Sequence, residues 1–201
     1  MPAGTTFHLI RHASYDLLGQ VLAGRSPGHS LNDVGRAEAE RLAQALSQRP
    51  IAALITSPLE RARETAAFIA KRLQLDVRIE PDLDEIDFGA WTGWRFDMLH
   101  AAQEWQIFNH LRSAAKIPGG ETMLQAQARA VAAIVRLHAQ WCGAEVAVVS
   151  HGDIVKAVLA YFAGMPIDLM RRLEIAPASR SILWLGEMDV SIGGINLSAS
   201  A

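Results

Sequence analysis

The 201-residue sequence predicts an α/β domain with a mostly parallel central sheet. Short apolar runs, partly β-branched, alternate with longer segments in which apolar residues recur at helical spacing. The chain is long enough for one domain with a sizeable core, and no linker-like stretch divides it. We therefore expect a single domain over residues 1–201. Half of the residues are apolar and a fifth are charged, which argues against the disordered and fibrous classes.

Four apolar runs are predicted to be buried strands, because each is brief and is followed by a polar or small residue. They are residues 7–10, 51–55, 146–149 and 181–185, and residues 77–79 form a fifth, shorter candidate. The alternation of these runs with helical segments is the pattern of strand–helix–strand units. It therefore favours parallel pairing of most strands.

Helical spacing predicts helices over residues 33–47, 59–73, 121–141 and 154–162. Ser30 and Asp33 are expected to cap the first helix, and Pro58 to stand at the opening of the second. Gly164 and Pro166 end the last one. The small and polar residues 193–201 are expected to fray, so the tail 187–201 is predicted to be flexible.

Charge and composition narrow the class of partner. The net charge is −2 and no long basic run exists, which argues against a nucleic-acid partner but leaves a local cationic pocket open. Cys142 is the single cysteine, so no intramolecular disulfide is expected. No stretch reads as a membrane span, and residues 1–6 do not read as a signal peptide. These features fit a cytoplasmic protein without a membrane partner.

Polar side chains follow the predicted strands where a parallel sheet binds ligands, at the carboxyl ends of the strands. Arg11 and His12 follow the first strand, and His151 follows the strand 146–149. If these strands are neighbours, the two imidazoles can face each other across one crevice. Arg61 falls in the first turn of a helix, beside unpaired N–H groups. Arginine there suits an anion, since its planar fork binds phosphate oxygens and stays charged.

An acidic segment, residues 83–93, contains Glu85 together with Asp84, Asp87 and aromatic residues. Desolvation among aromatic side chains can raise the pKa of a carboxyl group until it donates a proton near neutral pH. Two histidines, two arginines and one carboxyl group are the groups that phosphoryl transfer requires. The arginines neutralise phosphoryl oxygens, a neutral imidazole attacks phosphorus, and the carboxylic acid protonates the leaving oxygen.

Four motifs in this order resemble those of the histidine phosphatase superfamily, which includes the cofactor-dependent phosphoglycerate mutases. The motifs are Arg11-His12, Ser57-Pro58-x-x-Arg61-Ala62-x-x-Thr65-Ala66, Leu83-x-Glu85-x-x-Phe88-Gly89 and His151-Gly152. The turn Pro118-Gly119-Gly120-Glu121 also resembles the one that precedes a long helix in this family. Each motif alone is weak, but the set spans the chain from the first strand to the last.

The resemblance implies a three-layer α/β/α sandwich and a reaction that needs neither metal nor cofactor. It implies that His12 is the phosphorylated nucleophile and that Glu85 acts as general acid, then as general base for water. The phosphoryl group would be bound by a set of residues from three motifs: Arg11, Arg61, His151 and Gly152.

Two departures from the family pattern leave the substrate open. Ala13 and Ser14 replace the usual Gly-Glu after the nucleophile, and Asn32 stands where Thr is common. The short segment 93–118 resembles the phosphatase branch more than the mutases. Residues expected to border a substrate pocket are Ser14, Arg25, His29, Trp94 and Arg180.

The sequence thus predicts a phosphomonoesterase of histidine acid phosphatase type that acts on a small phosphorylated metabolite through a phosphohistidine. Mutase-type phosphoryl transfer, phosphoprotein hydrolysis and non-catalytic phospho-ligand binding stay open, as does a homodimer. A metallohydrolase is disfavoured, because clustered ligand spacings are missing and Arg11 and Arg61 would repel a cation. A P-loop enzyme is disfavoured too, because no Gly-x-x-x-x-Gly-Lys-Ser/Thr string occurs.

Overall fold

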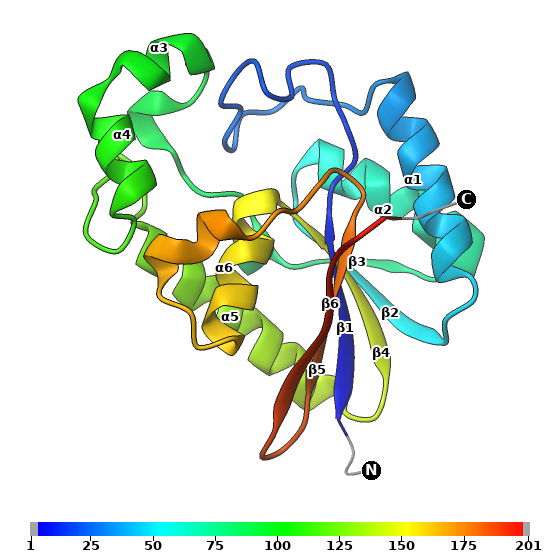
Figure 1. Ribbon diagram of the computed structural model, residues 1–201. Helices are drawn as coiled ribbons and strands as arrows, with labels where there is room; N and C mark the ends of the chain where they lie inside the picture. Colours follow the sequence, from blue (N-terminus) through cyan, green and yellow to red (C-terminus); the bar gives the residue numbers. More distant parts are fainter. Residues whose placement is uncertain (1–3, 199–201) are drawn as a thin grey trace.

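A six-stranded sheet forms the centre of the computed structural model, which describes residues 4–198 (Figure 1). The strand order is β3-β2-β4-β1-β5-β6. The strands are Thr5–Arg11 (β1), Ile51–Thr56 (β2), Val77–Ile79 (β3), Glu145–Ser150 (β4), Arg180–Leu185 (β5) and Val190–Leu197 (β6). The pairs among β1 to β4 are parallel, whereas β5 pairs antiparallel with both β1 and β6. All five predicted strands are confirmed, with small extensions at their ends.

Much of the tail 187–201, predicted to be flexible, belongs to strand β6. Residues Val190–Leu197 pair antiparallel with β5, and a turn leads into the strand where the Gly186 N–H donates to the Asp189 carbonyl at 3.0 Å. An edge strand is held by backbone hydrogen bonds, so small side chains do not prevent it from forming. Residues 199–201 of the predicted tail lie outside the described residues.

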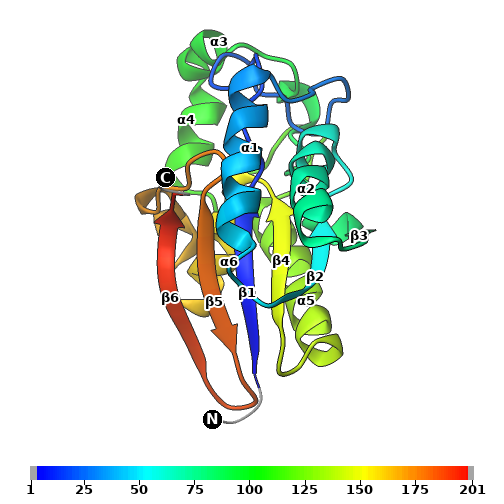
Figure 2. The same cartoon turned by 90° about the vertical axis from the view of Figure 1, so that its right-hand side faces the viewer.

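Helices cover both faces of the sheet, which confirms the sandwich (Figures 1 and 2). On one face lie α1 (Asp33–Leu46) and α2 (Glu60–Leu73), and on the other α5 (Met123–Gln140) and α6 (Gly152–Phe162). Alternate strand residues supply the two cores. Phe7 and Val148 pack in the α5–α6 core, whereas Ile10 and Val149 pack in the α1–α2 core. The layers follow from this alternation.

The helix starts differ slightly from the predicted ones. Asn32, rather than Ser30 or Asp33, caps α1, since its Oδ1 accepts from the Gly35 N–H at 2.8 Å. Leu59 is the N-cap of α2, so Pro58 stands just before the cap. No helix among residues 4–198 is long and apolar enough to cross a membrane.

Two short helices in the segment 93–118 were not predicted. They are α3 (Phe96–Ala101) and α4 (Gln103–His110), and they rise beyond the carboxyl end of the sheet (Figure 1). Trp105 of α4 packs edge-on against Trp91 with ring centroids 5.4 Å apart, and Phe108 packs against Phe88 at 6.2 Å. Helices of this length depend on tertiary packing, so local periodicity gives little sign of them. This aromatic cluster forms one wall above the strand ends.

Gly89 joins this wall to the turn before α5 and gives a test of the packing. Its φ is +46°, and an added Cβ would lie 2.3 Å from the Pro118 carbonyl oxygen. Gly93 has a φ of +85° but open space where a Cβ would be. We expect Gly93→Ala to cost only the backbone strain of about 1–2 kcal/mol. Gly89→Ala should cost at least about 3 kcal/mol, because strain and collision add.

Urea unfolding of the two variants measures this difference in the free energy of unfolding. Equal losses in the two variants would show that the Gly89–Pro118 approach has no energetic importance.

Candidate active site

His12 stands directly after β1 and is 3 % exposed. Its backbone N–H donates to the Ser150 carbonyl at 2.9 Å, which ties it to the end of β4. Ring Nδ1 lies 2.8 Å from the Ala13 carbonyl oxygen, which can only accept, so Nδ1 carries the proton and Nε2 keeps its lone pair. Burial, followed by the positive charge of Arg61, lowers the pKa of His12 well below the usual value. His12 is therefore a neutral imidazole with an unprotonated Nε2.

His151 follows β4 and faces His12, with ring centroids 5.3 Å apart. The facing imidazoles predicted from the sequence are confirmed, because β1 and β4 pair with Arg11 opposite Ser150. His151 Nε2 lies 2.7 Å from Ser57 Oγ, a hydroxyl that either donates to it or accepts from it. Burial, then Arg61, lowers the pKa of His151 well below the usual value. Both imidazoles are therefore uncharged at neutral pH.

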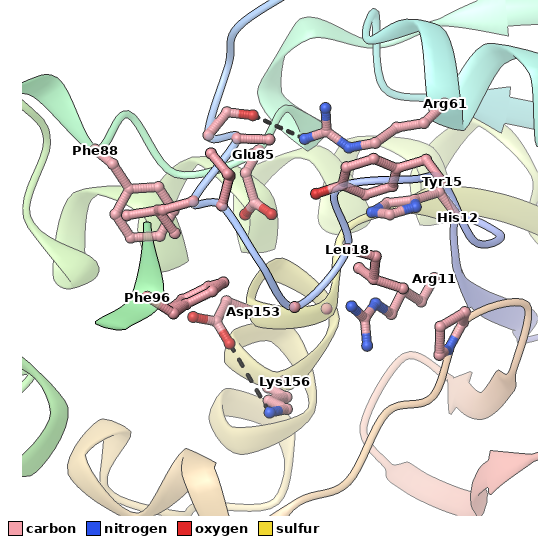
Figure 3. A pocket seen from close by; sticks show the side chains of 17 residues that line it. Arg11, His12, Tyr15, Leu18, Arg61, Glu85, Phe88, Phe96, Asp153 and Lys156 are labelled. Atoms are coloured by element: carbon pink, nitrogen blue, oxygen red, sulfur yellow. Dashed lines mark hydrogen bonds and ion pairs between the residues drawn. The ribbon is translucent and has the colours of Figure 1, made fainter. Parts of the chain in front are cut away.

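Two arginines place fixed positive charge beside these rings. Arg61 is 2 % exposed, and its Nη2 donates to the Gly24 carbonyl at 2.7 Å and lies 3.4 Å from His151 Nδ1 (Figure 3). Arg11 Nη1 donates to the Ile175 carbonyl at 2.7 Å. Carbonyl groups orient the guanidinium groups but do not neutralise them, so the site attracts an anion.

Gly152 lets Arg11 reach this position. A Cβ on Gly152 would lie 3.2 Å from Arg11 Nε, which is a tight approach, and Gly152 is also the first residue of α6. The positive end of this helix thus points toward the same region as the two guanidinium groups. Gly152 has a steric role that the sequence pattern did not reveal.

Glu85 is the carboxyl group with a proton available near neutral pH. Burial, and then the negative charge of Asp153, raises the pKa of Glu85 to about 7. Its Oε2 lies 3.8 Å from His151 Nδ1. Each of the three carboxyl groups of this loop accepts a backbone N–H: Asp84 from Glu85 at 2.8 Å, Glu85 from Ile86 at 2.9 Å and Asp87 from Gly89 at 3.0 Å. Glu85 differs from the other two because it lines the cavity described below and they do not.

These groups surround a cavity of about 350 Å³ at the carboxyl end of the sheet (Figure 3). Arg11, His12, Arg61, Glu85 and Gly152 line it, as the motifs led us to expect. His151 is fully buried and does not line it, and it contacts the cavity residues from behind. The remaining lining residues are Tyr15, Leu18, Gly19, Val21, Leu22, Ala23, Gly24, Phe88, Phe96, Asp153, Lys156 and Pro177.

The residues predicted to border a substrate pocket do not line this cavity, because other groups hold them. Ser14 binds Glu38 through its N–H at 2.9 Å and its hydroxyl at 3.0 Å. His29 lies 2.9 Å from Ser26 Oγ and packs against the ring of Tyr15 at 5.5 Å. His29 is therefore one layer behind the cavity wall.

Three further predicted pocket residues are also elsewhere. Arg25 donates to the Glu85 carbonyl at 2.7 Å and to Glu121 at 2.8 Å, so it supports the site from outside. Trp94 is 37 % exposed, and Arg180 lies on β5 with Nη1 3.3 Å from His8 Nδ1.

Sequence reasoning missed three cavity residues that give the far wall its character. Asp153 and Lys156 lie on the first turns of α6, with Asp153 Oδ1 3.9 Å from Lys156 Nζ (Figure 3). Their i, i+3 spacing after Gly152 was a usable signal, since it places both on one helix face. Phe96 of α3 had no such signal, because only the fold brings α3 to this edge.

Within the described range 4–198, no group of three or more His, Cys, Asp and Glu side chains is arranged to hold a metal ion.

The chain is similar to proteins of one family over nearly its whole length. A family model for the histidine phosphatase superfamily (branch 1) matches residues 7–197. An uncharacterized protein of Mycobacterium tuberculosis is 34% identical over 195 residues, 96% of each chain. Glucosyl-3-phosphoglycerate phosphatase of the same species is 28% identical over 169 residues, 79% of this chain and 75% of that protein. The structure of α-ribazole phosphatase from Shigella flexneri has a TM-score of 0.84 at 25% identity and 97% coverage of both chains.

The buried acid gives a prediction that needs no substrate. The folded protein holds the Glu85 proton more tightly than the unfolded chain does, so ionisation of Glu85 destabilises the fold as pH rises from 4.5 to about 7. The stability of Glu85→Gln relative to the wild type should therefore rise across this range, by up to about 3 kcal/mol, and level off above it.

In the same unfolding experiment, we expect the stability of Glu121→Gln relative to the wild type to change with pH in the opposite direction. Burial disfavours the charged form of Glu121, but hydrogen bonds from Arg129 and from the Asp87 amide outweigh it and lower its pKa. Its contribution to stability is present at neutral pH and fades as pH falls through that lowered pKa. If the stability difference between Glu85→Gln and the wild type does not vary with pH, Glu85 has an ordinary pKa.

Proposed function

Because the chain belongs to the histidine phosphatase superfamily, we propose that it is a metal-independent phosphomonoesterase acting on a small phosphorylated metabolite through a phosphohistidine at His12. One observation carries the proposal: a neutral imidazole with a free Nε2 lies beside two buried guanidinium groups and a carboxyl group that holds a proton near neutrality. A nucleophile, an anion site and an acid are thus combined in one cavity.

In the first step, His12 Nε2 attacks phosphorus and the bond from phosphorus to the ester oxygen breaks. Arg11 and Arg61 hold the non-bridging oxygens and offset their negative charge. Glu85 gives its proton to the departing oxygen, so the alcohol leaves neutral and the carboxylate remains. Every group involved except the substrate lines the cavity.

In the second step, water attacks the phosphohistidine. The Glu85 carboxylate takes the proton from the water, the bond from phosphorus to Nε2 breaks, and inorganic phosphate leaves with His12 neutral again. Glu85 thereby regains its proton, and the cycle closes without another reactant.

His151 has a supporting role in this scheme. Arg61 Nη2, which can only donate, lies 3.4 Å from His151 Nδ1, and the Ser57 hydroxyl, 2.7 Å from Nε2, donates to Asp84 Oδ1 at 3.3 Å. The uncharged ring therefore carries its proton on Nε2 and lies behind the cavity wall, against Arg61. In this scheme His151 helps to place the Arg61 guanidinium group beside the phosphoryl group.

Hydrolysis of a small metabolite is favoured by the cavity and by the relatives. The cavity of about 350 Å³ suits a small molecule, with Leu18 and Phe96 as apolar walls and Lys156 as a cation on the far side. Two of the relatives bear the names of phosphatases for glucosyl-3-phosphoglycerate and α-ribazole. Mutase activity or phosphoprotein hydrolysis would appear in the same assays as another product or another preferred substrate.

The direct test is hydrolysis of p-nitrophenyl phosphate by the purified protein in excess EDTA. We expect turnover by the wild type and a loss of at least about a thousandfold in His12→Ala, because the nucleophile is gone. His138→Gln, at the opposite end of the sheet beside Thr5, is the matched control and should retain activity.

An early acid-free quench should trap labelled phosphate on the wild type but not on His12→Ala. Activity that returns only with added metal, or an undiminished His12→Ala, would reject the mechanism. Phosphate binding without turnover of any phosphomonoester would show a binding protein instead.

The proton on Glu85 sets the expected pH profile. The value of kcat/KM for an alkyl phosphate should fall as pH rises above about 7, because Glu85 then loses the proton that the leaving oxygen needs. The lowered pKa of His12 should keep the acid side active to well below the usual imidazole pKa. Glu85→Gln should be slower by about a hundredfold or more and should lack the alkaline limb. An alkaline limb that persists in Glu85→Gln would assign it to another group.

A further inference from the structure

The loop that carries Glu85 is held through its backbone by a side chain from the opposite helix layer. Arg129 of α5 uses all five of its N–H donors there. Three go to consecutive parts of the loop: the carbonyls of Asp82 at 2.7 Å, Asp84 at 2.8 Å and Glu85 at 3.0 Å. The other two go to Glu121, at 3.0 and 2.7 Å. The Arg129 guanidinium group therefore fixes the position of the loop backbone relative to α5.

Glu121 joins Arg129 to a second arginine on the far side of the loop. Its Oε1 accepts from Arg129 Nη2 at 2.7 Å, from Arg25 Nη2 at 2.8 Å and from the Asp87 N–H at 2.9 Å. Arg25 Nε donates to the Glu85 carbonyl at 2.7 Å, so this one carbonyl receives both arginines. The three side chains, Arg25, Glu121 and Arg129, form what we call the loop clamp. Glu121 partly neutralises both cations, which offsets the cost of removing the largely buried Arg129 guanidinium group from water.

The loop clamp binds the backbone of Glu85 and leaves its carboxyl group alone. Within the described chain, that carboxyl accepts one hydrogen bond, from the Ile86 N–H at 2.9 Å, and Oε2 stays turned toward His151. Within residues 4–198, no clamp residue makes a hydrogen bond to the Glu85 carboxyl group. A proton donor works only within hydrogen-bond reach of the leaving oxygen, and a displacement of about 1 Å can cost about a hundredfold in rate. The position of the Glu85 carboxyl group is therefore set by the backbone of the loop.

We infer that Arg129, acting with Glu121 and Arg25, is a positioning residue that sets the Glu85 carboxyl for proton donation. This inference rests on the proposed function, since it concerns the acid of that reaction. Arg129 does not line the cavity, so we expect its effect on turnover to pass through Glu85. Loss of a residue that only stabilised the fold would reduce kcat/KM by the same factor for all substrates.

The same helix offers a matched control. Arg136 lies two turns further along α5 and binds the side chains of residues 80 and 82, just before the acidic segment 83–93. Its Nη2 donates to Asp82 Oδ2 at 2.6 Å and to Glu80 at 3.3 Å, and it is half exposed. Arg136→Ala removes a cation and an ion pair from the same segment without releasing the carbonyls of Asp84 and Glu85.

The experiment compares two substrates by kcat/KM, which reports only steps up to transfer onto His12. p-Nitrophenolate departs without a proton, whereas an alkoxide needs one from the acid. Arg129→Ala should reduce kcat/KM for an alkyl phosphate about tenfold or more beyond any loss with p-nitrophenyl phosphate. Arg136→Ala should leave the ratio of the two substrates unchanged. Arg129→Lys, which keeps the charge but loses the fork, should resemble Arg129→Ala and serves if the alanine variant does not fold.

A double-variant cycle with Glu85→Gln decides the route of the effect. In the Glu85→Gln background the acid is already absent, so Arg129→Ala should change the substrate ratio by less than about twofold. A ratio that falls equally in both backgrounds, or that is unchanged in Arg129→Ala, would overturn the positioning role. Failure of the proposed function has a different signature, because the wild type would then hydrolyse neither substrate or would keep its activity in His12→Ala.

Discussion

The parallel pairing of β1 with β4 is the constraint on which the rest of the site depends. It sets Arg11 opposite Ser150, and the next residue on each strand is a histidine. The two rings then face each other at 5.3 Å although 139 positions separate them in the chain, from 12 to 151. Because strands in a sheet can slip only by breaking their whole ladder, this geometry is rigid, and neighbouring loops are built around it.

Electrostatics then assigns each group its protonation state. Burial lowers the pKa of both imidazoles well below the usual value and raises the pKa of Glu85 to about 7, and the guanidinium groups of Arg11 and Arg61 stand beside them as cations. The site therefore holds two cations whose hydrogen-bond partners include uncharged carbonyl groups, an arrangement suited to an anion. The same burial that makes Glu85 a usable acid destabilises its ionised form, so part of the folding free energy is given up for chemistry.

The groups around this centre come from two sides of the cavity. His12, Arg61 and Gly152 stand at strand ends or first helical turns, and the loop clamp extends the same rigidity to Glu85 through carbonyl groups. The opposite wall comes from Phe96 of α3 and from Asp153 and Lys156 of α6. Under the proposed function, the ends of the strands would carry the chemistry and this wall would contact the leaving group of the substrate.

Sequence alone predicted β1 to β5, the four long helices and the cavity residues His12, Arg61 and Glu85, because strand alternation, helical spacing and the motifs around these three residues are local. Tertiary structure decided what depends on partners far apart in the chain. Residues 190–197 became β6 because β5 offered a free edge, and α3 and α4 formed because aromatic rings elsewhere stabilise them. Ser14 and Arg25 were expected to border the cavity, but hydrogen bonds to Glu38 and Glu121 hold them outside it. The hydrogen-bond partner of a side chain depends on tertiary packing, which brings together residues far apart in the chain and cannot be predicted from local sequence.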